Sequence, residues 1–153
     1  MAGVLKYLSV RGRANRQRYW LTGLSIVGLV FVSALVAGAL TILSPLLSVI
    51  VIPVWVALFV AGVTNGVRRL HDRGKTAWWL LVFYLLPILL SLPARVASYG
   101  TPDGFQAAAA FLALLGLPFS IWGFVQLGCL RGTIGPNEYG DDPIAPPVEA
   151  AFA

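Results

Sequence analysis

The side chains with chemical potential lie in one charged island, residues 65–76, between two long apolar stretches. The island contains the only histidine of the chain, and its candidate site residues are Arg68, Arg69, His71, Asp72, Arg73 and Lys75. Arginine can bind a phosphate through two donors at once, and a histidine can act as a general acid or base. The island therefore predicts contact with an anionic lipid headgroup, with catalysis on such a headgroup as a less favoured alternative.

A purely structural role competes with both interpretations. Arginines beside a membrane span orient and anchor the helices, but neither task requires the acid Asp72. Adjacent positions on a helix do not face each other, so His71 and Asp72 need not form a pair. We favour a structural role for these two residues over a catalytic one, and we predict no catalytic residue.

The composition indicates a membrane protein. The 153-residue chain is 58% hydrophobic and only 11% charged, against about 25% charged residues in soluble domains. Its apolar stretches reach the roughly 20 residues that a helix needs to cross a bilayer. We predict an all-α integral membrane protein, a bundle of four transmembrane helices with spans at about residues 19–43, 46–64, 77–92 and 107–130.

Prolines and glycines divide these spans. Pro45 ends the first span, so the first two spans form a tight hairpin. Pro53 is predicted to kink the second span, and residues 93–106 are predicted to form a loop rich in turn formers. Gly116 and Pro118 are predicted to weaken or bend the fourth span.

The distribution of basic residues predicts the orientation. Five of the eleven Lys and Arg residues lie in the segment 1–18, four in the island, and one each in the loop and in the tail 131–153. The positive-inside bias then places both termini and the island in the cytoplasm. Within the first segment, Val4 to about Val10 is predicted either as an interfacial helix or as a basic tail. The end of the tail, from about residue 144, is predicted to be disordered.

Several kinds of site are not expected. The net charge of +5 comes without a nucleic-acid-binding motif, so no nucleic acid is predicted as a partner. One cysteine, Cys129, and one histidine support neither an internal disulfide nor a protein-only metal site, and no cofactor is predicted. Small residues at four-residue spacing, Ser33, Ala37 and Thr41, predict close packing against a neighbouring helix or against a second protomer.

Three segments resemble the YhaH-like family of small bacterial inner-membrane proteins of unknown function. The first is Gly12-Arg13, Arg16 and Tyr19-Trp20; the second is Arg68 to Asp72, Gly74-Lys75 and Trp78-Trp79; the third is Gly132, Gly135, Asn137, Tyr139, Gly140 and Asp142-Pro143. Thr76-Ala77 stands where the family pattern has Ser-Gly. The resemblance implies a four-helix protein of the bacterial inner membrane, and it brings no established activity or catalytic residue.

The tail is expected to meet the island, because the predicted orientation places both in the cytoplasm. Glu138, Asp141 and Asp142 are predicted to fold back and pair with the basic side chains of the island. Asn137 and Tyr139 are predicted to shape a turn there.

We therefore predict a non-enzymatic scaffold, lipid-binding protein or accessory subunit whose functional surface is cytoplasmic. Its partners would be the phospholipid bilayer, anionic lipid headgroups, and a homo-oligomer or larger membrane complex. The alternative is a small transporter or channel acting as an oligomer, lined by Ser, Thr and Gln126. The cores of the four spans contain no ionisable residue of the kind that coupled carriers use. An enzyme acting on a lipid headgroup through His71 is the least supported.

Overall fold

The structure, a computed structural model, describes residues 10–97 and 102–144. Within these ranges the regular structure is helical, apart from one isolated bridge between Asn137 and Gly140. The elements are α2 (Arg16–Leu43), the 3₁₀ helix η1 (Pro45–Val51), α3 (Ile52–Asp72), the π-helix η2 (Leu81–Leu85), α4 (Leu86–Val96), α5 (Asp103–Phe124) and the π-helix η3 (Val125–Cys129). Most of the predicted Val4–Val10 helix and the predicted disordered end of the tail lie outside the described residues.

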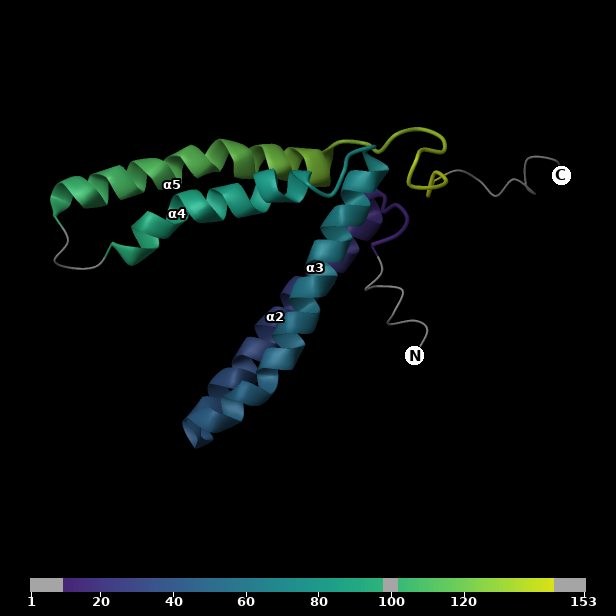
Figure 1. Cartoon of the computed structure of the whole chain (residues 1–153). Coiled ribbons are helices and arrows are strands. Elements are labelled where there is room, and N and C mark those ends of the chain that lie inside the picture. The colour runs from purple at the N-terminus through teal and green to yellow at the C-terminus, as the bar shows by residue number, and fades with distance from the viewer. Residues whose placement is uncertain (1–9, 98–101, 145–153) are drawn as a thin grey trace.

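The helices form two hairpins that diverge from a common end (Figure 1). One hairpin consists of α2, η1 and α3, and the other of η2, α4, α5 and η3. The prediction of an all-α chain with four helices is confirmed, but the expected single bundle is replaced by two hairpins joined at one end. Lipid is as apolar as the helix surfaces, so the hydrophobic effect does not force the two hairpins together along their length.

Three of the helical stretches are long and apolar enough to cross a membrane: Arg16–Leu43, Pro45–Asp72 and Asp103–Cys129. The remaining apolar stretch, Leu81–Val96, is shorter. Asn15 begins α2 as its N-cap, because its side-chain Oδ1 accepts a hydrogen bond of 2.8 Å from the backbone N–H of Arg18.

Pro45 follows the end of α2 as predicted, but Pro53 and Pro93 act differently from the predictions. Pro53 lies in the first turn of α3, directly after η1, so a change of helix type takes the place of the predicted kink. Helix α4 continues through Pro93 to Val96, so the connection to α5 is shorter than the predicted loop. Helix α3 continues to Asp72, which makes the first eight of the twelve island residues helical.

Glycines allow α5 to approach the other arm of its hairpin closely. A Cβ atom on Gly116 would lie 3.2 Å from Cα of Pro87, and one on Gly123 would lie 2.7 Å from Cβ of Phe83. Gly116, predicted to weaken the helix, is therefore a packing position. Where the hairpins meet, Leu70, Phe83 and Leu127 form a buried apolar cluster that includes both of them.

Candidate functional site

The central residue of the site is Arg69, in the last turn of α3. Its side chain is fully buried where the two hairpins meet. Nε donates to the carbonyl of Leu127 at 2.7 Å, and Nη2 donates to the carbonyl of Leu130. Nη1 donates to the carbonyl of Ala14 at 3.2 Å and to the carboxylate of Asp72. The guanidinium of Arg69 thus bonds three backbone carbonyls and one acid.

Arg69 is one of four side chains that cap the end of the second hairpin. The carbonyls of residues 127–131 are consecutive, and each accepts a hydrogen bond from the first hairpin or the loop that follows it. Besides the two bonds from Arg69, they are Trp20 Nε1 to Gly128 (3.1 Å), Arg16 Nη1 to Cys129 (3.1 Å) and Arg73 Nη1 to Arg131. The last carbonyls of a helix lack intrahelical partners and carry partial negative charge, so cationic donors stabilise them.

The end of α3 is capped in return by segments outside its own helix. The bonds are Ala14 N to Arg68 O (3.1 Å), Asn137 Nδ2 to His71 O (2.9 Å) and Thr133 N to Asp72 O (2.8 Å). Each hairpin therefore ends in carbonyl groups that are satisfied largely by residues from elsewhere in the chain. We call this arrangement the capping junction: Arg13, Arg16, Trp20, Arg69, Asp72, Arg73 and the carbonyls of residues 127–131.

Asp72 balances the cations of the capping junction. Its side chain is buried and forms ion pairs with Arg69 and, at 3.1 Å, with Nη2 of Arg13. A carboxylate at the C-terminal end of a helix is disfavoured by the helix dipole, and burial adds a desolvation cost. Two guanidinium groups offset both costs. Arg13 also donates to the carbonyls of Thr133 and Gly135, each at 2.6 Å, which ties the tail to the same acid.

Two glycines are required by the close approach of the backbone at this site. A Cβ atom on Gly132 would overlap the carboxylate of Asp72. A Cβ atom on Gly128 would lie 2.8 Å from the Trp20 ring. At both positions a neighbouring side chain occupies the space that a Cβ atom would need.

His71 is held by the tail. Its ring stacks on Tyr139, with ring centroids 3.9 Å apart and an interplanar angle of 5°. Nδ1 of the ring is buried and has no hydrogen-bond partner within the described part of the chain. Lys75 lies over the ring of Trp79, with Nζ 4.6 Å from the ring centroid. These contacts place both side chains against aromatic partners.

Among the described residues, no ion pair joins Glu138, Asp141 or Asp142 to a basic side chain of the island, although the charge of Glu138 acts on the ring of His71. Asp142 accepts hydrogen bonds of 3.0 Å from the backbone N–H groups of Ile144 and Gly135. The bond from Ile144 lowers the pKa of Asp142 most, followed by the bond from Gly135. The nearby charges of Arg13 and Arg131 lower this pKa further. Neither arginine belongs to the island. The tail meets the island through Asn137 and Tyr139, and Asp141 is exposed.

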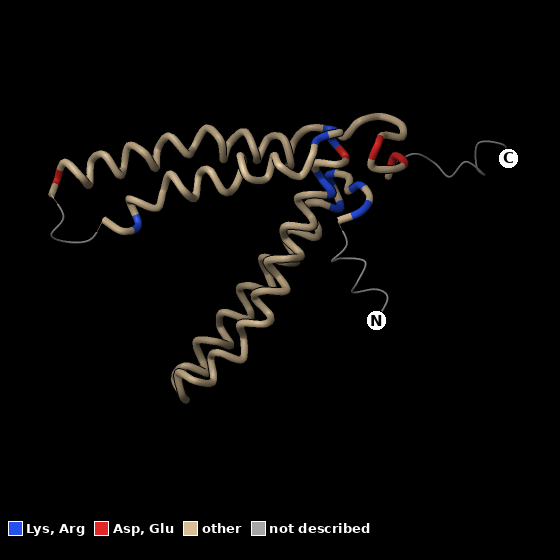
Figure 2. Tube along the Cα trace, in the orientation of Figure 1, with Lys and Arg blue, Asp and Glu red and all other residues tan. Residues whose placement is uncertain are grey.

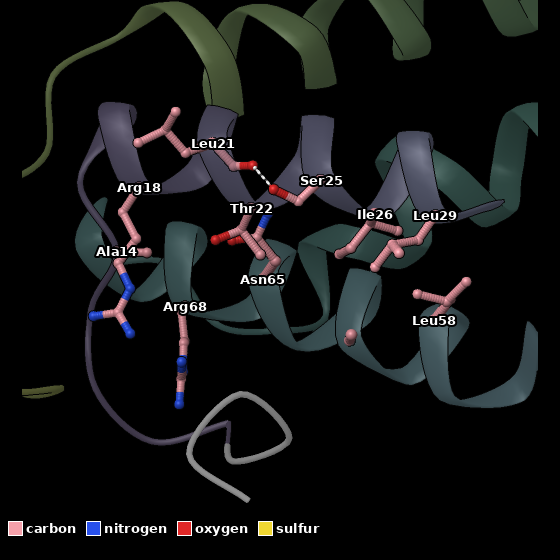
Figure 3. A pocket seen from close by; sticks show the side chains of 11 residues that line it. Ala14, Arg18, Leu21, Thr22, Ser25, Ile26, Leu29, Leu58, Asn65 and Arg68 are labelled. Atoms are coloured by element: carbon pink, nitrogen blue, oxygen red, sulfur yellow. Dashed lines mark hydrogen bonds between the residues drawn. The ribbon is translucent and has the colours of Figure 1, made fainter. Parts of the chain in front are cut away.

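The structure separates the two adjacent island arginines. Arg69 faces the capping junction, whereas Arg68 lines a groove between α2 and α3 together with Arg18 (Figure 3). Sequence reasoning missed the five carbonyls of residues 127–131, because backbone acceptors leave no residue-type signal. One indication of these acceptors was present in the sequence: the last apolar helix is predicted to end just before Gly132, on the same side of the membrane as the arginines.

Residues 7–141 match the family described as "Protein of unknown function (DUF805)", and the chain belongs to this family. Among its relatives is the inner membrane protein YhaH of Escherichia coli K12, 29% identical over 151 residues that cover 92% of each chain. The inner membrane protein YhaI of the same organism is 29% identical over 145 residues, covering 92% of this chain and 91% of the relative. No solved structure gives a significant match. The predicted membership in a YhaH-like inner-membrane family is confirmed.

Proposed function

We propose that the chain is a non-enzymatic, multi-pass scaffold of the bacterial inner membrane, with both termini and the capping junction on the cytoplasmic side. The orientation rests on charge. Segment 1–18 and the island hold nine of the eleven basic residues, five plus four, and both adjoin the junction. Basic residues collect at that end among the described residues (Figure 2), while the far end carries Arg95 in α4 and Asp103 in α5.

The proposal includes four crossings. The stretch Leu81–Val96 has 16 residues, or roughly 24 Å at 1.5 Å per residue, against a hydrocarbon core of about 30 Å. It packs beside the longer α5 in a hairpin and runs alongside α5 for most of the length of that helix. Trp78 and Trp79 precede it, as expected for an aromatic belt at the cytoplasmic interface.

The observation that carries the scaffold function is the engagement of Arg69 through all three of its guanidinium nitrogens. A buried guanidinium that bonds three carbonyls and Asp72 serves to hold two hairpins in a fixed relation. His71 stacks on Tyr139, and Asp72 is shared between two arginines. These contacts favour the structural role of both residues over acid–base catalysis.

The polar side chains of the helices favour the scaffold over a transporter. The hydroxyl of Ser25 donates to the carbonyl of Leu21 and that of Thr41 to the carbonyl of Ala37, each at 2.8 Å within the same helix. Oε1 of Gln126 accepts a bond of 3.1 Å from Arg73. Groups engaged in this way are poor candidates to line a pathway for ions.

The diverging hairpins leave apolar faces that contact lipid, further membrane helices or a second copy of the chain. We extend the proposal to a place in a homo-oligomer or larger membrane assembly, with the cytoplasmic junction as the fixed platform. Trp55 Nε1 donates to Ser33 Oγ at 3.0 Å, so part of the small-residue stripe of α2 packs inside its own hairpin. Elsewhere on α2, a Cβ atom on Gly38 would meet nothing within 4 Å, so the helix surface at this position is open to a neighbour.

Reporter fusions in the native membrane test the orientation and the number of crossings. A fluorescent protein fused after Ala153 should fluoresce, and alkaline phosphatase fused after Ser44 or Gly100 should be active, because these positions are placed outside the cytoplasm. Phosphatase activity at Ala153, or none at Gly100, would contradict the proposed topology.

The variant His71→Ala should reach the membrane and support the physiological role of the chain at the wild-type level if no acid–base step is involved.

A further inference from the structure

Residues 132–142, which we call the tail turn, lie around the side chain of Arg13. Nη2 of Arg13 donates to the carbonyl of Thr133 at 2.6 Å. Nη1 donates to the carbonyl of Gly135 at 2.6 Å and to that of Gly140 at 3.3 Å. Three carbonyls of one short turn thus converge on a single guanidinium group.

The charge of Arg13 explains why carbonyl groups gather around it. Nε of Arg13 donates to Oδ1 of Asp72 at 3.2 Å, but this carboxylate also pairs with Arg69. Two buried guanidinium groups therefore share one acid, and one positive charge is in excess where the side chain of Arg13 is only 1% exposed. A buried charge is costly unless polar groups replace the water that it has lost. The carbonyls of the tail turn are such groups.

The tail turn, described in full, has no apolar core of its own. None of the side chains of residues 131–144 is buried, and Ile134 is 78% exposed. Gly135 and Gly140 adopt φ angles of +78° and +131°, and fixing glycine in such conformations costs conformational entropy. The free energy that orders the turn must therefore come from hydrogen bonds. Bonds from a charged donor such as Arg13 are stronger than the neutral bonds within the turn.

We propose that the tail turn is a guanidinium-binding site, which becomes ordered when it receives Arg13 of the same chain. The acceptors are distributed over the three nitrogens of a planar group, and a guanidinium presents five donors in that plane. A lysine ammonium carries its donors on one atom and cannot reach all of these acceptors. The site therefore selects a guanidinium over an ammonium of the same charge. This inference depends only on the contacts of Arg13, so it goes beyond the proposed scaffold role and is independent of the orientation of the chain.

Amide hydrogen exchange of the full chain in nanodiscs tests the site by chemical rescue. In Arg13→Ala, exchange at residues 133–140 should be about tenfold faster than in the wild type, because the turn loses the cation that orders it. Guanidinium chloride at roughly 10 mM, suited to a weak site for a small cation and far below denaturing concentrations, should restore most of the protection. Ammonium chloride at the same concentration should restore none, and neither salt should change exchange in the wild type.

Two further variants keep the test decisive if Arg13→Ala does not reach the membrane. Arg13→Lys keeps the charge, and its exchange at residues 133–140 should still be about tenfold faster than in the wild type. Arg18→Gln removes an exposed arginine from the first turn of α2 and should leave this exchange unchanged.

Wild-type exchange in Arg13→Lys, or equal effects of guanidinium and ammonium on Arg13→Ala, would overturn the guanidinium site. Neither result would change the reporter-fusion outcome, so a failure of this inference is distinguishable from a failure of the proposed topology.

Discussion

Arg69 and Asp72 form a buried ion pair one turn apart at the end of α3, and each is also bonded to another part of the chain. Arg69 reaches the carbonyls that end the second hairpin, and Asp72 pairs with Arg13 ahead of the first. Two residues of one helix thus connect the segment before α2, the end of η3 and the tail. In lipid, polar contacts of this kind determine where apolar hairpins meet.

Removing the cation of this pair should unfold the junction. Arg69→Gln leaves Asp72 with one buried partner and leaves the carbonyls of Leu127 and Leu130 without donors, so we expect a loss of about 3–5 kcal/mol in the free energy of unfolding. Arg69→Lys keeps the charge but loses the planar set of donors. Its free energy of unfolding should therefore lie between those of the wild type and Arg69→Gln. Denaturant unfolding in detergent micelles measures both.

Arg95→Gln is the matched control for this series, because Arg95 is exposed and lies far from the junction. It should change the free energy of unfolding by no more than about 0.5 kcal/mol. If Arg69→Gln were as stable as Arg95→Gln, the ion pair would contribute nothing to the joining of the hairpins.

A methyl group at Gly132 should have a similar effect through shape alone. Its Cβ would overlap the carboxylate of Asp72, so either the carboxylate or the tail backbone must move. We expect Gly132→Ala to lower the free energy of unfolding by about 1–3 kcal/mol. Gly28→Ala is the control, since its Cβ meets nothing within 4 Å and alanine is the better helix former. That control should gain about 0.5–1 kcal/mol, and equal effects of the two substitutions would refute the close approach.

The stack of Tyr139 on His71 should hold the tail against α3. Tyr139→Ala removes an aromatic contact of about 0.5–1.5 kcal/mol, whereas Tyr139→Phe keeps the ring. Trypsin cleavage after Arg131, in protein reconstituted into nanodiscs, should accelerate in the alanine variant and stay at the wild-type rate in the phenylalanine variant. Equal rates in all three proteins would show that the stack does not restrain the tail.

The turn closed by Asp142 should loosen in acid. Its pKa is lowered by the N–H groups of Ile144 and Gly135, so the carboxylate holds a proton more weakly in the folded turn than in a free tail. The stabilisation is therefore complete above the ordinary pKa of about 3.9, and it is lost as the pH falls through the lowered value. Amide hydrogen exchange of residues 135–144 between pH 6 and pH 2, corrected for the intrinsic exchange rate, measures it. Asp142→Asn should show no such transition, and a transition unchanged in this variant would assign it to another group.

The sequence identifies the helices and the polar end of the molecule for clear physical reasons. Apolar length predicts helices in a bilayer, and Pro45 marks the turn of the first hairpin. The three motif segments also meet at one end of the structure, in agreement with their predicted location on one side. Type and spacing of residues suffice for these features, because each follows from local chemistry or from the count of basic residues.

The direction of individual side chains needs the tertiary structure. Arg68 and Arg69 differ by roughly 100° around α3, and nothing in their types indicates which one faces the second hairpin. The partners of Arg69 are backbone carbonyls, which occur at every position of a chain. The divergence of the hairpins is similarly hidden, since an apolar helix surface suits lipid as well as another helix.

The most direct test of the capping junction is a distance distribution between the far ends of the two hairpins. Spin labels at Ser48 and Gly104, in a Cys129→Ser background, report the separation by pulsed electron paramagnetic resonance in nanodiscs. We predict one narrow distribution in the otherwise native chain and a broad one in Arg69→Gln, because the guanidinium fixes the angle between the hairpins. A distribution that is equally narrow in both proteins would contradict the central role of Arg69.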